Sequence, residues 1–128
     1  MQVNRINSYQ QNFQGISFHD GVTDVIKHRV KVSELKTLQD LVADIKSNKL
    51  VSANVYLQEG GDSSKLGANI YTTVNNSEVR NEYVDEGLFY RFKSPVSFFK
   101  LICKKVNKMT EKVNGEVYKN DVIEQIKK

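Results

Sequence analysis

The chain has 128 residues, of which 39% are hydrophobic and 27% are charged. This balance is ordinary for a globular protein and too apolar for a wholly disordered one, and the length suits one domain with one hydrophobic core. Cys103 is the only cysteine, so a framework of intramolecular disulfides is excluded. We therefore expect a domain that folds without covalent cross-links.

The start of the chain lacks the features of a secretory signal. Residues 1–14 contain seven Asn or Gln residues and no apolar run, which predicts a mobile tail over residues 1–15 ahead of a single domain over residues 16–128. No stretch of the sequence approaches the length of apolar chain that spans a membrane. One cysteine and no secretory signal are typical of the cytoplasm, where we expect this protein.

The net charge of +4 is distributed unevenly along the chain. Residues 1–92 hold ten basic and eleven acidic side chains, whereas residues 93–128 hold nine and four. The C-terminal third therefore carries the positive charge, and any surface for an anionic partner is expected there.

The first elements are predicted from the spacing of apolar residues. Apolar residues alternate with polar ones over residues 22–32, which predicts a strand with a basic outer face. That outer face consists of Lys27, Arg29 and Lys31. Ser33 is then a suitable N-cap, and an apolar stripe over residues 35–45 predicts a helix that ends near Asn48.

The middle of the chain predicts an antiparallel sheet. Residues 51–57 and 68–74 alternate between apolar and polar side chains, as half-buried strands do, and a polar loop joins them. A turn is expected at residues 75–76, and residues 88–92 predict the last strand. Residues 79–84 are ambiguous and could extend a hairpin arm.

Ser94 followed by Pro95 is a strong signal for the start of a helix. The serine accepts a hydrogen bond from a free backbone N–H, and proline at the first helical position has no N–H to satisfy. Apolar residues recur every three or four positions up to Val113, and Asn114 with Gly115 is a typical stop. A short further helix near the C-terminus could follow. The predicted fold class is α+β, with a mostly antiparallel sheet of three to five strands and two main helices in the order β-α-β-β-β-α.

The residue types that carry out chemistry do not converge in the sequence. His19 and His28 have no metal-binding spacing with each other or with Cys103. Asp20 beside His19 is typical of a turn, and Cys103 falls next to the apolar stripe of a helix, where a structural thiol is expected. An enzyme built on these residues would need them in one cleft. The glycine-containing loop over residues 59–67 lacks the spacing of a phosphate-binding loop. We expect no metal, no cofactor and no catalytic residues.

Four lysines follow one another at i, i+4 spacing in the predicted C-terminal helix: Lys100, Lys104, Lys108 and Lys112. We refer to this set as the lysine ridge. Repulsion between like charges at this spacing costs a few tenths of a kcal/mol per pair in an isolated helix. The lysine ridge is therefore either a solvated face or a surface kept for an anionic partner.

The order helix, three strands, helix from Ser33 to Asn114 is similar in outline to the double-stranded RNA-binding domain, whose second helix presents lysines to phosphates. The likeness is one of topology. The second helix of that family begins with lysines and small, alanine-rich positions, whereas the helix here begins with Ser94, Pro95 and Val96. No motif matches residue by residue, so the resemblance transfers no functional residue.

The sequence favours a noncatalytic binding module that works through its surface. The first hypothesis is a protein-interaction domain of adaptor or inhibitor type, whose exposed sheet face leaves large side chains free for a partner. Those side chains are Tyr56, Tyr71, Phe89 and Arg91. The alternative is RNA or DNA binding by the lysine ridge. The residues expected to assist the ridge are Lys27, Arg29 and Lys31.

Overall fold

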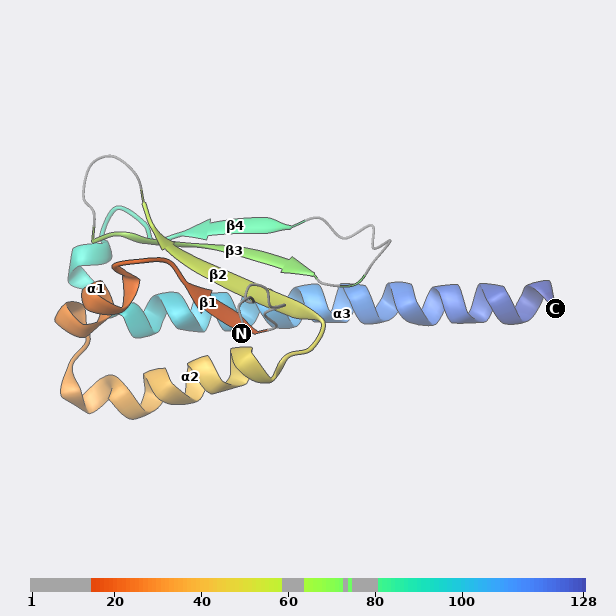
Figure 1. Ribbon diagram of the computed structural model, residues 1–128, viewed down its shortest axis with the longest axis horizontal. Coiled ribbons are helices and arrows are strands. Elements are labelled where there is room, and N and C mark those ends of the chain that lie inside the picture. The colour runs from red at the N-terminus through yellow and green to blue at the C-terminus, as the bar shows by residue number, and fades with distance from the viewer. Residues whose placement is uncertain (1–14, 59–63, 73, 75–80) are drawn as a thin grey trace, which may run out of the picture.

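The computed structural model describes residues 15–58, 64–72, 74 and 81–128, so the predicted tail over residues 1–14 lies outside the described residues. The chain has the predicted α+β fold (Figure 1). Its elements in chain order are β1 (Ile16–Phe18), α1 (Val22–Arg29), η1 (Val32–Glu34), α2 (Leu35–Ser47), β2 (Val51–Leu57), β3 (Leu66–Thr72), β4 (Glu82–Asp85), η2 (Tyr90–Phe92) and α3 (Pro95–Lys127).

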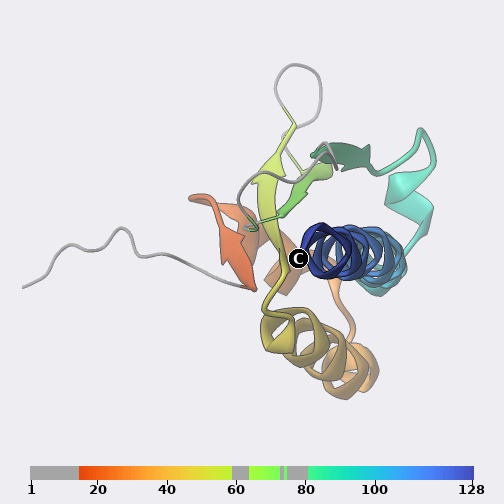
Figure 2. The ribbon, with the colours of Figure 1, turned by 90° about the vertical axis from the view of Figure 1, so that its right-hand side faces the viewer.

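The four strands form one sheet in the order β1-β2-β3-β4. The β1–β2 pair is parallel, and the other two pairs are antiparallel. A parallel pair needs a crossover connection, and α1 and α2 lie on the connection from β1 to β2. Helices α2 and α3 lie side by side against one face of the sheet (Figure 2). The opposite face carries no helix of the described chain.

Alternation along the strands decides which side chains enter the core. The buried residues of β2 and β3 on the helix side are Val51, Ala53, Val55, Leu66, Ala68 and Ile70. Helix α3 contributes a stripe in steps of three and four residues: Phe99, Ile102, Val106, Met109 and Val113. Each large side chain that is fully buried adds roughly 1.5–3 kcal/mol of transfer free energy, so this contact holds α3 against the sheet.

The predicted strand over residues 22–32 is wrong, because Val22–Arg29 form helix α1. Val22, Val25 and Ile26 also fit the i, i+3, i+4 spacing of a helix, and this face packs against the core. The helix dipole supports the helix, since one acidic residue lies in its first turn and three basic residues lie in its last. The apolar spacing was compatible with both structures, and the charges at the two ends favoured the helix.

The predicted strand over residues 88–92 is also wrong, because Tyr90–Phe92 form the short 3-10 helix η2. The fourth strand is Glu82–Asp85, which lies mostly within the stretch that the sequence left ambiguous. Its buried residue Val84 pairs with Ala68 of β3. After β4 the chain turns away from the sheet. The next residue, Glu86, places its carboxylate in a buried ion pair.

Arg29 and Glu86 form this ion pair, which is bidentate. The Nη1 and Nη2 atoms of Arg29 lie 2.5 Å and 2.8 Å from the two carboxylate oxygens of Glu86. The two side chains are only 13% and 5% exposed. Arg29 also donates to the backbone carbonyl oxygens of Ser64, Tyr90 and Lys93. Glu86 accepts the backbone N–H of Leu66 at 2.8 Å. The pair thus joins α1, the start of β3 and the segment around η2.

We predict that Arg29→Ala lowers the free energy of unfolding by about 3–5 kcal/mol, because it leaves a buried carboxylate without its cation. Arg29→Lys should recover only part of this loss, since an ammonium cannot form two parallel hydrogen bonds with Glu86. Urea denaturation followed by circular dichroism measures both variants. The control is Arg29→Met with Glu86→Leu, which removes both charges and should be more stable than Arg29→Ala. A loss below about 1 kcal/mol for Arg29→Ala would contradict this account.

Helix α3 begins where the sequence predicted. The Oγ atom of Ser94 accepts the backbone N–H of Val96 at 3.1 Å, and Pro95 occupies the first helical position. The helix has 33 residues, which makes it about 50 Å long at 1.5 Å per residue. Its C-terminal part projects beyond the strands of the sheet (Figure 1).

The predicted stop at Asn114 and Gly115 is wrong, because α3 continues through both residues to Lys127. The residues expected to form a separate short helix are the end of α3. A helix that is already anchored gains a hydrogen bond for each residue it adds, whereas one glycine costs about 1 kcal/mol relative to alanine. Only Gly15 and Gly21 adopt positive φ among the described glycines, so Gly115 does not provide a left-handed cap.

We predict that Gly115→Ala stabilises the end of α3 by about 1 kcal/mol. An added Cβ at Gly115 would meet no atom within 4 Å, so the gain comes from helix propensity alone. Amide hydrogen exchange over residues 116–124 should become slower. The control is Gly21→Ala, which should destabilise the fold because Gly21 has φ of +85°. Unchanged exchange in the Gly115→Ala variant would contradict the prediction.

Candidate functional site

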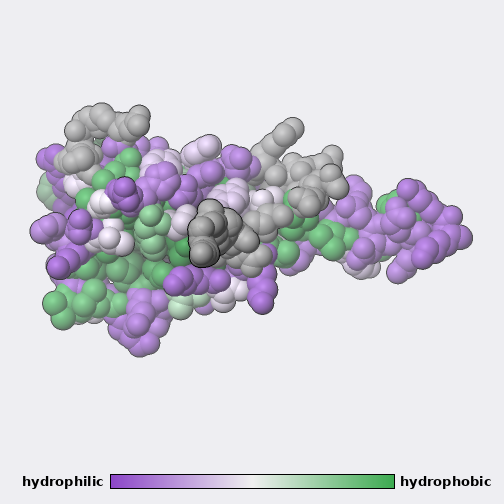
Figure 3. Space-filling model, viewed as in Figure 1, coloured by the Kyte–Doolittle hydropathy of each residue, from purple (hydrophilic) through white to green (hydrophobic). Residues whose placement is uncertain are grey.

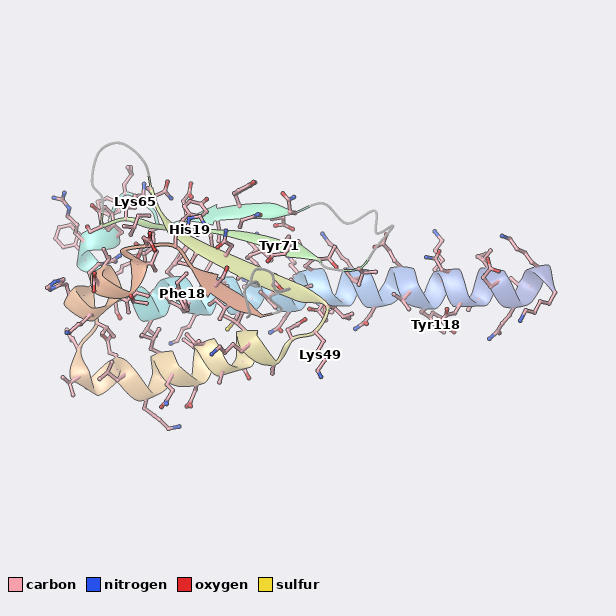
Figure 4. The ribbon with its side chains drawn as sticks, in the orientation of Figure 1. Phe18, His19, Lys49, Lys65, Tyr71 and Tyr118 are labelled. Atoms are coloured by element: carbon pink, nitrogen blue, oxygen red, sulfur yellow. The ribbon has the colours of Figure 1, made fainter. Side chains whose placement is uncertain are left out.

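The face of the sheet opposite α2 and α3 is lined by polar and aromatic side chains. They come from alternate positions of the four strands and from the residue after β1: Ser17, His19, Asn54, Tyr56, Asn69, Tyr71, Tyr83 and Asp85. We refer to this set as the open sheet face. Figure 4 shows His19 and Tyr71 on the sheet, and Phe18 between β1 and α3. The open sheet face is thus separated from the core by the strands themselves.

Side chains on the open sheet face hold one another in place. The Oγ atom of Ser17 donates to Oδ1 of Asn54 at 2.8 Å, and Nδ2 of Asn54 lies 2.9 Å from Nε2 of His19. An amide nitrogen can only donate, so this contact requires the His19 tautomer whose proton is on Nδ1. The centres of the His19 and Tyr56 rings are 6.1 Å apart. These contacts restrict the rotamers of the face before any partner binds.

Tyr56 lies across Gly67 of the neighbouring strand. A Cβ at Gly67 would come within 2.6 Å of the tyrosine ring, so the close approach depends on glycine. Burial, and after it the charges of Asp85 and Tyr83, raise the pKa of Tyr56 above its usual value. The hydroxyl therefore stays protonated at neutral pH and can donate a hydrogen bond. Asp85 accepts the side-chain amide of Gln58 at 2.5 Å.

Asn69 lies in a row across the sheet with Asn54 on one side and Tyr83 on the other. Its Oδ1 atom is buried and has no hydrogen-bond partner in the part of the chain that the structure describes. An acceptor left in this state costs about 1–3 kcal/mol. Buried polar atoms without a hydrogen-bond partner are rare in native folds. Where a native protein does leave such an atom unpaired, the position is often part of a functional site.

Two of the four residues predicted to contact a protein, Tyr56 and Tyr71, lie on the open sheet face. Phe89 and Arg91 do not, because Phe89 precedes η2 and Arg91 lies within it. The residues of the face that the prediction missed are Ser17, His19, Asn54, Asn69, Tyr83 and Asp85. The alternation of Tyr83 and Val84 within residues 82–85 was the available signal for the fourth strand.

The lysine ridge lies on the surface of α3 that faces away from the sheet. Phe99, Ile102 and Val106 on the same helix point into the core, which places the ridge on the outer side. All four lysines are exposed, and none forms an ion pair within the described chain. Lys105, on the flank of the helix, lies 3.7 Å from the carboxylate of Glu82.

Lys27, Arg29 and Lys31 do not form the basic strand face that the sequence predicted. Lys27 lies in α1 and Lys31 follows it, and both are exposed. Arg29 is held in the ion pair with Glu86. An anionic partner would have to break that ion pair to reach Arg29, so the three residues do not act as one surface.

Cys103 and His19 lie on opposite sides of the sheet, so they do not form a nucleophile and base pair. The Sγ atom of Cys103 lies 3.6 Å from the carbonyl oxygen of Leu41, between α3 and α2. Burial, and after it the charge of Asp44, raise the pKa of the Cys103 thiol. Nowhere in the described ranges do three side chains of His, Cys, Asp or Glu come together as metal ligands would.

We predict that native Cys103 reacts more slowly with iodoacetamide at pH 7 than the same thiol in the urea-unfolded chain, because its raised pKa leaves less thiolate. Alkylation followed by mass spectrometry measures both rates. Asp44→Asn removes a charge that disfavours the thiolate and should speed the native reaction. Equal native and unfolded rates would show that the thiol is neither buried nor perturbed.

Comparison of the chain with protein-family models, curated proteins and solved structures found no match. In the part of the chain that the structure describes, no helix combines the length and apolar composition required to cross a bilayer.

Proposed function

We propose that this protein is a noncatalytic binding module that holds a protein partner against the open sheet face. The observation that carries the proposal is the gathering of aromatic and amide side chains on the one sheet face that no described helix covers. Tyrosine is common at such sites because it offers a large, rigid contact area together with a polar hydroxyl. Asparagine and serine add hydrogen bonds that can adapt to a partner.

The charges on the open sheet face favour a protein over a nucleic acid. Among the outward residues of the described strands none is lysine or arginine, and Asp85 is a carboxylate. Lys65 directly precedes β3 at the edge of the face, where its carbonyl oxygen accepts the backbone N–H of Gln58. Proteins that bind single-stranded nucleic acids combine stacking aromatic rings with cations that follow the phosphates. The open sheet face has the rings, but its strands carry no row of cations. Contact with a protein requires aromatic anchors and few charges at the centre of the interface.

The centre of the face has the layout of a binding hot spot. Tyr71 follows Asn69 on the same face of β3, Tyr83 lies opposite Asn69 on β4, and Tyr56 lies diagonally from it on β2. Three tyrosines therefore surround an acceptor, Oδ1 of Asn69, that has no hydrogen-bond partner among the described residues. The contacts of Tyr56 with His19 and Gly67 fix its ring in advance. Fixing side chains in advance lowers the entropy cost of association.

An adaptor or an inhibitor acts by occupying a surface of its partner, so it needs a rigid contact face and no reactive group. The strands of the open sheet face are backed by fully buried side chains of α3, including Phe99 and Ile102. This backing makes the face rigid. The adaptor or inhibitor hypothesis is supported by this backing together with the exposed ring of Tyr83 and the half-buried rings of Tyr56 and Tyr71.

RNA or DNA binding by the lysine ridge is a second candidate. It is supported by four exposed lysines that have no ion pair in the described chain. They lie on the side of the molecule opposite the open sheet face. If all four contact phosphates, the logarithm of the association constant should fall with the logarithm of salt concentration with a slope of about −3 to −4.

We predict that a photo-reactive benzoylphenylalanine in place of Tyr83 forms a covalent product with a protein when it is irradiated in an extract of the source cell. Unlabelled wild-type chain should compete for this product. Tyr71→Ser with Tyr83→Ser should compete at least about 30-fold more weakly, because hot-spot aromatic residues contribute 2 kcal/mol or more. The measurement is the amount of cross-linked product on a denaturing gel.

The matched control for competition is Lys104→Glu with Lys108→Glu, which changes the other candidate surface and should compete as well as the wild type. Circular dichroism confirms that both competitors are folded. The same photo-reactive residue at position 104 tests the ridge directly. Two results would contradict the proposal and favour the lysine ridge as the functional surface. One is a cross-linked product that forms only when the photo-reactive residue is at position 104. The other is a product that is lost when the extract is treated with nuclease.

A further inference from the structure

Large apolar side chains are exposed at the end of the molecule opposite the C-terminus of α3. They are Val32, Leu35, Leu88, Phe89 and Phe92, and we refer to them as the apolar tip. Val32, Leu88 and Phe92 are 85%, 86% and 85% exposed. Figure 3 shows hydrophobic surface at this end of the molecule. Single exposed apolar residues are common, but several on adjoining segments mark an interaction surface.

The two segments that carry the apolar tip are fastened to each other. Arg29, which ends α1, donates to the carbonyl oxygens of Tyr90 and Lys93 on either side of Phe92. Glu34, between Val32 and Leu35, accepts hydrogen bonds from the backbone N–H of Lys31 and the side chain of Ser94. The exposed apolar residues are therefore held at one end of the fold, although they are distant in sequence.

Exposed lysines accompany the apolar tip, and we refer to them as its basic rim. Lys27, Lys31 and Lys93 are exposed and lie on the same two segments as the apolar residues. From residue 27 to residue 36 the only carboxylate is Glu34, which is occupied by the hydrogen bonds just described, and residues 87–93 contain none. This end of the molecule therefore combines exposed apolar side chains with exposed positive charge.

We propose that the apolar tip docks on the surface of an anionic lipid bilayer. The apolar side chains would enter the boundary between headgroups and acyl chains, and the lysines would lie among the anionic headgroups. Apolar insertion and attraction to anionic lipid are the two contributions that give peripheral proteins their membrane affinity. The surface chemistry required is that of a phosphatidylserine-containing membrane.

Charge complementarity favours the bilayer over a second copy of the chain. Two tips brought face to face would bring the positive charges of Lys31 and Lys93 from both copies into one interface, which is repulsive. An anionic bilayer offers negative charge around an apolar interior, which matches both parts of the tip. The proposal concerns residues outside the open sheet face and the lysine ridge, so it stands independently of the proposed protein partner.

The chain contains no tryptophan, so one introduced tryptophan reports on its own surroundings. Phe92→Trp puts that probe in the apolar tip. Its emission should shift to shorter wavelength when vesicles of phosphatidylcholine mixed with phosphatidylserine are added. Vesicles of phosphatidylcholine alone should give little shift. The matched control is Tyr118→Trp at the other end of the molecule, where Tyr118 is 73% exposed. Its emission should not change with either vesicle.

Charge variants in the Phe92→Trp background test the basic rim. Lys31→Ala with Lys93→Ala should weaken vesicle binding by about 30-fold, since each lysine near an anionic surface contributes about fivefold. Lys104→Ala with Lys108→Ala removes the same charge from the lysine ridge and should leave binding within about threefold. Leu88→Ser should weaken binding while circular dichroism stays unchanged, because Leu88 makes almost no contact with the fold.

Three results would each overturn the proposal. The first is no shift of the Phe92→Trp variant with phosphatidylserine vesicles at low salt. The second is an equal shift in the Tyr118→Trp variant. The third is equal loss of binding in the tip and ridge charge variants, which would mean that only net charge matters.

Discussion

The buried ion pair between Arg29 and Glu86 is the interaction on which the arrangement of the other parts depends. Two charges removed from water are stable only when they are fully hydrogen-bonded, so the chain brings three carbonyl oxygens and one backbone N–H around this pair. These contacts hold η2 beside the end of α1 and next to the start of β3. Because η2 leads directly into Ser94 and α3, the pair also fixes where the long helix begins.

A sheet covered on one side gives the protein surfaces of different chemistry. Helices α2 and α3 bury the apolar side of the strands, and their own outer sides remain in water. The open sheet face is then free to carry tyrosines and asparagines, because residues on that side take no part in the core. The lysine ridge lies on the far side of α3, and the apolar tip lies at the end of the sheet where α1 and η2 meet. The three surfaces do not share residues, so the proposed partners would not compete for the same side chains.

Local patterns were sufficient wherever one periodicity had no competitor. The strand at residues 51–57, the apolar stripe of the helix after Ser33 and the start of α3 all had consistent local signals. The predicted N-cap at Ser33 is wrong, because Ser33 lies within η1 and Glu34 directly precedes α2. Residues 22–29 fitted both a strand and a helix, and contact with the core selected the helix. Residues 88–92 resembled a strand. In the fold, however, the carbonyl oxygens of Tyr90 and Lys93 accept hydrogen bonds from the Arg29 side chain, which holds this segment outside the sheet. No local pattern reveals these hydrogen bonds, because the partners are more than 60 residues apart.

The sequence by itself determined the α+β class, the one-sided alternation of β2 and β3 and the exposed lysines of α3, because these follow from neighbours along the chain. It also placed Tyr56 and Tyr71 on a surface. Only the tertiary structure decided that Tyr83, Asn69 and His19 join them, since that grouping depends on strand pairing. Tertiary structure likewise decided that Arg29 pairs with Glu86 and does not belong to a basic surface. It also decided that Phe92 and Val32 are both exposed at the end of the molecule opposite the C-terminus of α3. Burial and pairing act across the fold, so a linear pattern cannot fix their outcome.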